Sequence, residues 1–174
     1  RYWAFGAEAE VAMATQAAVA WNMIYTPAEA GPVLPVSRSW SFVPEEENPD
    51  FRYVTFCWDN LFASWIAAHH EGGRPVAYSN LIQSVRSKTA AGFVPNFAAA
   101  LKKSQDRTEP PLGAYVLRAL HRRSGEVWLV ELLYDDLKDW NDWFVRRRMV
   151  DGLVVLGSWN EQPGHCPPSK CNDM

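Results

Sequence analysis

The stretch FCWDNLFASWIAAHHEGGRPVAYSNLIQSVRSK, residues 56–88, contains the pattern that decides the fold. Apolar residues recur at three- and four-residue spacing before Gly72-Gly73 and again after Pro75, which indicates two amphipathic helices. Glycine commonly ends a helix and proline suits a first helical turn, so we predict helices over Asp59–His70 and Val76–Lys88. The stretch therefore predicts an antiparallel helical hairpin.

The rest of the chain repeats this alternation of helices and loops. Long loops rich in Trp, Arg, Asp, Asn and Pro alternate with short connections such as Ser124-Gly125. A layered helical toroid with its site on one rim produces this alternation. An irregular helical solenoid is the alternative, although no motif recurs at a fixed period. The other predicted elements are helices over Ala7–Tyr25, Leu112–Arg123 and Glu126–Arg148, and an extended loop or short strand over Gly31–Trp40.

The composition is that of a globular chain with one core. Of 174 residues, 48% are hydrophobic and 21% are charged, with a formal net charge of −3. Nothing is basic enough to predict a nucleic-acid surface, and no stretch is long and apolar enough to cross a membrane. The nine tryptophans exceed the usual share. Indoles stack on the apolar faces of sugar rings as well as filling cores, so their number is compatible with a carbohydrate ligand.

Three cysteines bear on the compartment and on metal binding. Cys166 and Cys171 stand close enough for a small-loop disulfide, and a bridge there would favour a secreted or luminal protein. Two unpaired thiols are the alternative. Together with His165 they could offer zinc ligands, but the spacing matches no zinc motif. Cys57 lies among aromatic residues, which indicates a buried small hydrophobe, and we expect neither a metal nor another cofactor.

Three polar loops carry the residues that could perform chemistry: Pro35–Trp40, Phe56–Asn60 and Asp106–Ala114. Each has a structural explanation. Asp59 could cap its helix, the charges of the third loop could form a solvated cluster, and the tryptophans could be core. Together, however, the loops contain what a sugar site needs. Carboxylates accept hydrogen bonds from paired hydroxyls, arginine donates in a fixed fork, and indoles stack on the ring.

Five segments follow one another along the chain: Pro35–Trp40, Cys57–Ala63, Gly92–Asn96, Asp106–Pro111, and Trp140–Phe144 with the Asp-Gly-Leu and Leu-Gly-Ser tripeptides after it. In this order they resemble the N-terminal half of the catalytic domain of glycoside hydrolase family 63, the processing α-glucosidase I-like enzymes. The resemblance covers almost the whole chain. Trehalases share the Trp-Asp, Gly-Phe-Val-Pro-Asn and Pro-Pro elements and are the related second choice.

The resemblance implies an all-α fold over residues 1–174, an incomplete (α/α)6 toroid of roughly the first half, with long rim loops. It implies inverting hydrolysis of α-glucosidic bonds in an oligosaccharide or glucoside, with the glucose held by Trp58 and Asp59. Several family members have Gln at the position of Glu109, so the carboxylate departs from the pattern. The other matching pocket positions are Arg38, Trp40, Asn96, Arg107 and Glu109.

The resemblance also implies that the catalytic residues lie outside this segment. An inverting enzyme needs a general acid and a general base that hold a water between them. In the family the acid is an Asp after the Leu-Gly-Ser loop, and the base is a Glu far toward the C-terminus. No carboxylate up to Met174 fits either motif, so we assign none of them as catalytic. Five predicted helices also fall short of the twelve in an (α/α)6 toroid, and we expect a second polypeptide, or a continuation of the same precursor, to complete it.

Two alternatives remain at this point. A trehalase-like hydrolase differs only in the acceptor sugar. A helical sugar-binding or scaffolding module without catalysis would use the tryptophans mainly as core.

Overall fold

The computed structural model describes residues 6, 8–26, 31–38 and 53–155. They form five α-helices and three short antiparallel strand pairs, so the mainly helical fold expected from the sequence is confirmed. Trp40, Cys166 and Cys171, singled out above, lie outside these residues. Within them, no helix has the length and apolar character needed to span a bilayer. The helices are α1 (Ala9–Ala20), α2 (Cys57–Ala67), α3 (Arg74–Arg86), α4 (Gly113–Ser124) and α5 (Trp128–Arg147).

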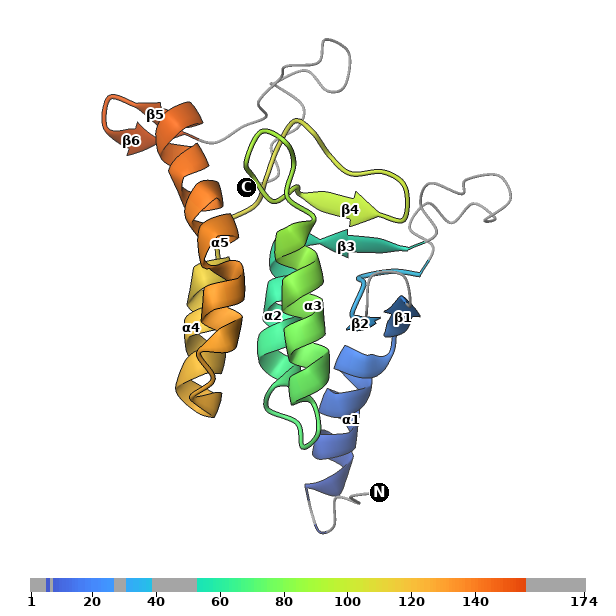
Figure 1. The fold of residues 1–174 in the computed structure, drawn as a ribbon. Helices are drawn as coiled ribbons and strands as arrows, with labels where there is room; N and C mark the ends of the chain where they lie inside the picture. The colour runs from blue at the N-terminus through green and yellow to red at the C-terminus, as the bar shows by residue number, and fades with distance from the viewer. Residues whose placement is uncertain (1–5, 7, 27–30, 39–52, 156–174) are drawn as a thin grey trace, which may run out of the picture.

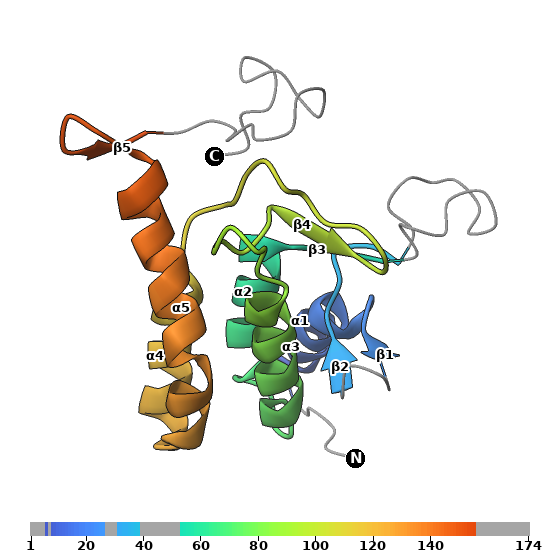
Figure 2. The same ribbon diagram turned by 45° about the horizontal axis from the view of Figure 1, so that its top comes forward.

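Four of these helices form two antiparallel hairpins that stand side by side (Figures 1 and 2). α2 packs against α3 and α4, and α5 packs against α3 and α4. We call the end where α2 and α4 begin the upper end, and the end where each hairpin turns the lower end. Adjacent helical hairpins are what an (α/α)6 toroid is built from, so the arrangement is compatible with the toroid, which stays a prediction.

Glycine and proline set the hairpin turns. Gly72 and Gly125 have φ angles of +72° and +73°, a backbone conformation that side chains disfavour. Gly73 passes so close to Ala67 that an added Cβ would overlap its carbonyl oxygen. Pro75 lies in the first turn of α3, where its missing N–H has no intrahelical partner to lose. The predicted turn between α2 and α3 is therefore confirmed.

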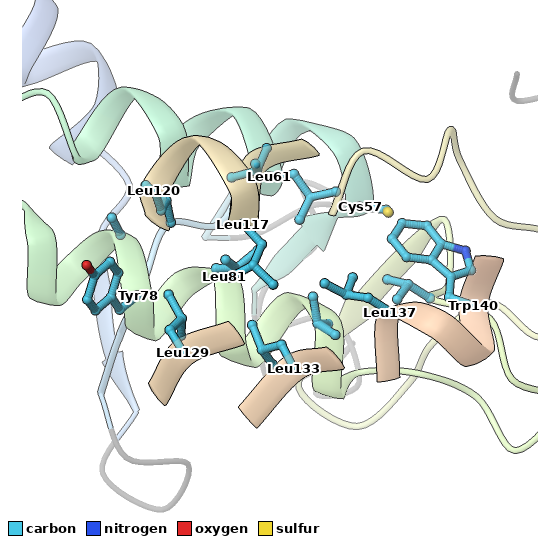
Figure 3. Close-up of a cluster of buried hydrophobic side chains, with 14 of the residues drawn as sticks. Cys57, Leu61, Tyr78, Leu81, Leu117, Leu120, Leu129, Leu133, Leu137 and Trp140 are labelled. Carbon is cyan, nitrogen blue, oxygen red and sulfur yellow. The ribbon is translucent and has the colours of Figure 1, made fainter. Parts of the chain in front are cut away.

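The core lies between the two hairpins (Figure 3). Leu61 of α2, Leu81 of α3 and Leu133 of α5 are completely buried. Each such leucine contributes about 1.5–3 kcal/mol by leaving water. Trp140 of α5 belongs to the same cluster, is 1% exposed, and donates its indole N–H to Thr108 Oγ1 at 3.1 Å. The core thus extends to the upper end and holds a loop there.

A buried polar seam fixes α2 against α3. The Asn80 side chain makes four hydrogen bonds, which is all that an amide with two donors and two acceptor sites commonly makes. Its Oδ1 accepts from the Leu34 N–H (2.8 Å) and from Asn60 Nδ2 (2.9 Å). Its Nδ2 donates to the Asn60 carbonyl (2.7 Å) and to Ser64 Oγ (2.8 Å). Asn60 therefore faces α3 and serves the packing of the hairpin.

Short strand pairs join the loops to the helices. β3 (Val54–Phe56) runs directly into α2 and pairs with β4 (Phe97–Ala99), so that Phe56 lies opposite Phe97. This pairing brings the loop Gly92–Asn96 beside the start of α2. The remaining pairs are β1 (Ile24–Thr26) with β2 (Gly31–Val33), and β5 (Met149–Val150) with β6 (Leu153–Val154).

The structure shifts the bounds of the predicted helices, and two of these shifts bear on the site. The helix expected over Ala7–Tyr25 ends at Ala20. The chain turns there and enters β1, whose backbone pairs with β2 and does not continue the helix. α2 begins at Cys57, two residues before the predicted start, with Phe56 in extended conformation before it. Asp59 therefore lies inside the first turn and is not the cap of α2.

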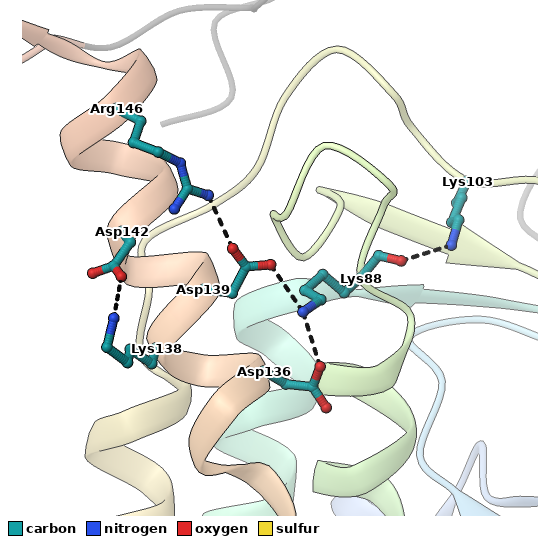
Figure 4. A network of polar contacts seen from close by, with 7 residues as sticks. All are labelled: Lys88, Lys103, Asp136, Lys138, Asp139, Asp142 and Arg146. Carbon is teal, nitrogen blue, oxygen red and sulfur yellow. Dashed lines mark hydrogen bonds and ion pairs between the residues drawn. The ribbon is translucent and has the colours of Figure 1, made fainter.

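An ion-pair network joins Lys88, just after α3, to α5 near the upper end (Figure 4). The Lys88 ammonium lies 2.9 Å from Asp136 and 3.0 Å from Asp139, and Arg146 reaches the other oxygen of Asp139 at 2.9 Å. Partial burial alone would lower the pKa of Lys88, but the two aspartates together raise it. The hydrogen bond from Lys88 is the main reason why the pKa of Asp139 lies below its usual value, and Arg146 adds to it.

We expect Lys88→Met to lower the free energy of unfolding by about 1 kcal/mol at neutral pH, because the pairs are only partly shielded from water. The matched control is Lys138→Met, which breaks a more exposed pair with Asp142 and should have a smaller effect. Urea unfolding measures both. Since the pKa of Asp139 is depressed in the fold, its contribution is present above the usual aspartate pKa and is lost as the pH falls through the lowered value. The difference between Lys88→Met and the unmodified protein should therefore shrink in acid, and a difference that persists there would contradict the assignment.

Candidate functional site

The first turn of α2 is built from tertiary contacts. Phe56 precedes the helix and has no side-chain group that could cap it. The Cys57 N–H donates instead to the carbonyl oxygen of Asn96 at 2.9 Å. The next N–H, that of Trp58, donates to Glu109 Oε2 at 2.7 Å. Two loops from later in the chain thus complete the start of α2.

Glu109 lies inside this junction and is 5% exposed. Its second oxygen, Oε1, accepts from Asn96 Nδ2 at 2.9 Å. The backbone N–H of Asn96 in turn donates to the carbonyl of Arg107 at 3.0 Å. Both carboxylate oxygens of Glu109 are therefore bound to the protein itself. The Asn96 Oδ1 atom is buried and finds no hydrogen-bond partner in the described part of the chain.

The buried thiol of Cys57 lies in the same junction. Burial is the main cause that raises the pKa of Cys57 well above its usual value, and the charge of Glu109 raises it further. A backbone hydrogen bond from Glu109 opposes these effects. A thiol held protonated in this way is a poor nucleophile, so Cys57 is a packing residue, as predicted.

Trp58 and Asp59 face outward from the same turn. The Trp58 indole is 43% exposed, and its ring lies 6.2 Å from that of Phe62 one helical turn later. Asp59 is exposed and makes no hydrogen bond or ion pair within the described residues. An aromatic surface next to an available carboxylate can hold a ring that has one apolar face and a rim of hydroxyls.

The loop before α4 is braced on both sides. Asp106 is buried and pairs with Arg107 at 2.7 Å. The Thr108 hydroxyl donates to the Val94 carbonyl and accepts from the Trp140 indole. This bracing holds Glu109 at the start of α2, so the junction is fixed to the core by the Trp140 side chain of α5.

Of the other predicted pocket residues, Arg38 lies in a different place. Its guanidinium donates to the backbone carbonyls of Trp21 (3.1 Å) and Met23 (3.4 Å), just beyond α1. There it satisfies backbone carbonyls of the turn between α1 and β1. The upper end brings together Trp58, Asp59, Asn96, Arg107 and Glu109. Arg38 instead donates to the segment after α1.

The inward role of Glu109 was not foreseen from the sequence. The sequence offers Asp59 as a local cap, and only the structure shows that Phe56 precedes the helix and that its N–H groups require acceptors from elsewhere. Sequence alone does not say which of the later acidic residues supplies one.

The outward-facing residues of the candidate site, Trp58 and Asp59, are both exposed. Three hollows lie elsewhere on the described part of the chain, and Trp58, Asp59 and Glu109 line none of them. The hollow at the lower end contains Tyr78 and Trp128, with ring centroids 5.6 Å apart, and the Glu126 carboxylate, which accepts from the Trp128 indole at 3.0 Å. No group of three or more His, Cys, Asp or Glu side chains within the described residues could hold a metal ion.

Comparison with known families gives one finding. A model described as the mannosylglycerate hydrolase MGH1-like glycoside hydrolase domain matches residues 52–168, well over half of the chain. No curated protein and no solved structure matches. The matched residues include the start of α2, both loops that close on it, and the helices of both hairpins.

Proposed function

Because this chain belongs to the family of MGH1-like glycoside hydrolase domains, we propose that it forms the sugar-binding part of an inverting glycoside hydrolase. The proposed substrate is an α-linked hexoside, with an α-glucoside as the leading candidate. The observation that carries the proposal is the outward-facing Trp58–Asp59 pair, on a helical turn whose Trp58 N–H is bound by the buried Glu109 carboxylate. Family membership favours a hydrolase over a purely scaffolding module.

In this proposal Asp59 accepts hydrogen bonds from two neighbouring hydroxyls of the hexose, while the Trp58 and Phe62 rings lie against its apolar face. Hydrogen bonds to a charged acceptor are stronger than neutral ones, about 1.5–3 kcal/mol each. Two such bonds to a carboxylate that has no partner within the described residues would hold the sugar in one orientation. Binding in a defined orientation is the part of catalysis that this site can supply.

The acid and base of an inverting reaction are a second requirement. The acid protonates the leaving oxygen, and the base activates a water on the opposite face of the sugar. Glu109 has both oxygens bound by the protein and Asp106 is paired with Arg107, so neither is assigned to these roles. We place the two catalytic carboxylates on a further segment of the precursor or a second polypeptide, which would also complete the predicted toroid.

The description of the matched family favours a second candidate substrate. It names a mannosylglycerate hydrolase, whose substrate joins a hexose to a small hydroxy acid. The sugar-facing role of Trp58 and Asp59 is the same for a mannoside as for a glucoside. The two candidates differ in the stereochemistry of the hexose and in the group that leaves.

The test uses the full-length protein with an α-glucosyl disaccharide, mannosylglycerate and trehalose, and follows the first-formed sugar by proton NMR. We expect hydrolysis of the disaccharide or of mannosylglycerate, with the β-anomer released first because the mechanism inverts. Cleavage of trehalose alone would replace the proposal by a trehalase-like enzyme. Release of the α-anomer first, or no cleavage of any of the three, would contradict it.

A further inference from the structure

The start of α2 depends on one buried carboxylate from a distant part of the chain. Glu109 follows Trp58 by 51 residues, yet its Oε2 accepts the Trp58 N–H at 2.7 Å. The first N–H groups of a helix have no intrahelical acceptor, and α2 has no local side chain to supply one. Glu109 fills that role from another loop.

From this geometry we infer that Glu109 and Asn96 act as a positioning clamp for the sugar-binding turn of α2. The clamp consists of the Trp58 N–H, the Glu109 carboxylate and the Asn96 amide, with the Cys57 N–H on the Asn96 carbonyl completing it. Its effect is to hold Trp58 and Asp59 where a hexose can meet both. The inference rests on the proposed function for its catalytic consequence, while the clamp itself is a property of the fold.

The energetics of burial favour a positioning role for Glu109. A buried carboxylate is costly unless its oxygens are hydrogen-bonded, and here each oxygen has a donor. A negative charge is also favourable at a helix N-terminus, where the exposed N–H groups carry partial positive charge. Both donors, the Trp58 N–H and Asn96 Nδ2, belong to the protein itself, so the contacts that orient this carboxylate do not require a sugar. The clamp therefore reassigns Glu109 from sugar contact to a positioning residue.

The clamp is anchored to the helical core. Thr108, the residue before Glu109, is held by the Val94 carbonyl and by the Trp140 indole of α5. Asn96 is held by the Arg107 carbonyl through its own backbone N–H. A displacement of this loop would carry Glu109 with it, and the turn with Trp58 and Asp59 would lose its acceptor.

The orientation of Asn96 makes a discriminating test possible. Its Oδ1 is unpartnered within the described residues, so rotation of the amide would present an acceptor in place of the Nδ2 donor. In Glu109→Gln the new amide oxygen can still accept from the Trp58 N–H, and its NH₂ can donate to the rotated Asn96. In Glu109→Met the side-chain length remains but both acceptors are lost. Only the methionine variant should break the clamp.

The experiment measures kcat/KM of the full-length enzyme on the α-hexoside that it cleaves. In parallel, it follows the Trp58 backbone amide resonance in ¹⁵N-tryptophan-labelled protein. Trp58→Phe identifies that resonance. We expect Glu109→Met to lower kcat/KM by about 10- to 100-fold, as misplacement by roughly an ångström does, and to move the Trp58 amide proton upfield. Glu109→Gln should stay within about threefold of the unmodified enzyme, because its hydrogen bonds are preserved. Glu131→Gln, an exposed position on α5, is the matched control and should change neither.

Thermal unfolding of each variant confirms that the comparison is made on folded protein. If Glu109→Gln lost as much activity as Glu109→Met while its Trp58 resonance stayed in place, the charge itself would be required and the clamp role would be wrong. An unmoved Trp58 resonance in Glu109→Met would also overturn it. If the unmodified protein hydrolysed no hexoside, the proposed function would fail, and the resonance would still decide whether the clamp exists.

Discussion

Asp59→Ala should lower kcat/KM toward the α-hexoside that the enzyme cleaves by about 10²- to 10³-fold, because two hydrogen bonds from sugar hydroxyls to a charged acceptor are lost. The fold should be nearly unaffected. Asp59 is exposed and has no hydrogen bond or ion pair within the described residues, so its removal leaves no buried group unsatisfied. Only a favourable interaction with the N-terminus of α2, about 0.5 kcal/mol, disappears with it.

Steady-state kinetics on the full-length enzyme measure this effect, and Asp135→Ala is the matched control. Asp135 is an exposed aspartate on α5, away from the first turn of α2, and its replacement should leave kcat/KM unchanged. A kcat/KM for Asp59→Ala equal to that of the control would remove Asp59 from the sugar site.

Trp140→Ala should produce the largest loss of stability among the substitutions considered, about 3–5 kcal/mol. The side chain is 1% exposed, and an added Cβ on Gly113 of α4 would come within 3.2 Å of its ring, so the indole fills the space between α4 and α5. The substitution also leaves Thr108 without its indole donor, next to Glu109. The cavity and the lost hydrogen bond act together, and the melting temperature should fall by about 10 °C.

Urea and thermal unfolding test this prediction with two comparison variants. Trp140→Phe keeps most of the ring and should lose about 1–2 kcal/mol. Trp128→Ala removes an indole that is 46% exposed and should cost clearly less than Trp140→Ala. Equal losses for Trp128→Ala and Trp140→Ala would show that Trp140 is not part of the buried core as described.

Much of the helical fold could be predicted from the sequence because its signals are local. Gly72, Gly73 and Pro75 mark the turn between α2 and α3, and the apolar spacing on both sides indicates a helix before and after it. The pairing of β3 with β4 could not be predicted in the same way. It depends on contacts between residues far apart in the chain, such as Phe56 with Phe97.

The candidate site was also only partly predictable from the sequence. That Trp58 and Asp59 precede the apolar face of a helix is visible in the sequence, and their outward position follows from it. The inward orientation of Glu109 is not visible, because an acidic residue before a Pro-Pro pair is as compatible with a solvated loop as with a buried acceptor. The placement of Arg38 on the carbonyls beyond α1 likewise depends on how that helix ends, and the sequence indicated a longer helix.

The most direct test of the central claim is a titration of ¹⁵N-tryptophan-labelled protein with the intact α-hexoside that the enzyme cleaves. The titration is done at a temperature where turnover is slow and is followed through the indole N–H resonances. Trp58→Phe and Trp128→Phe assign the two relevant signals, one at the upper end and one at the lower hollow. The proposed function predicts that the Trp58 resonance shifts in a saturable manner while the Trp128 resonance stays in place. A shift of Trp128 with Trp58 unchanged would place the sugar at the opposite end of the helices and contradict the claim.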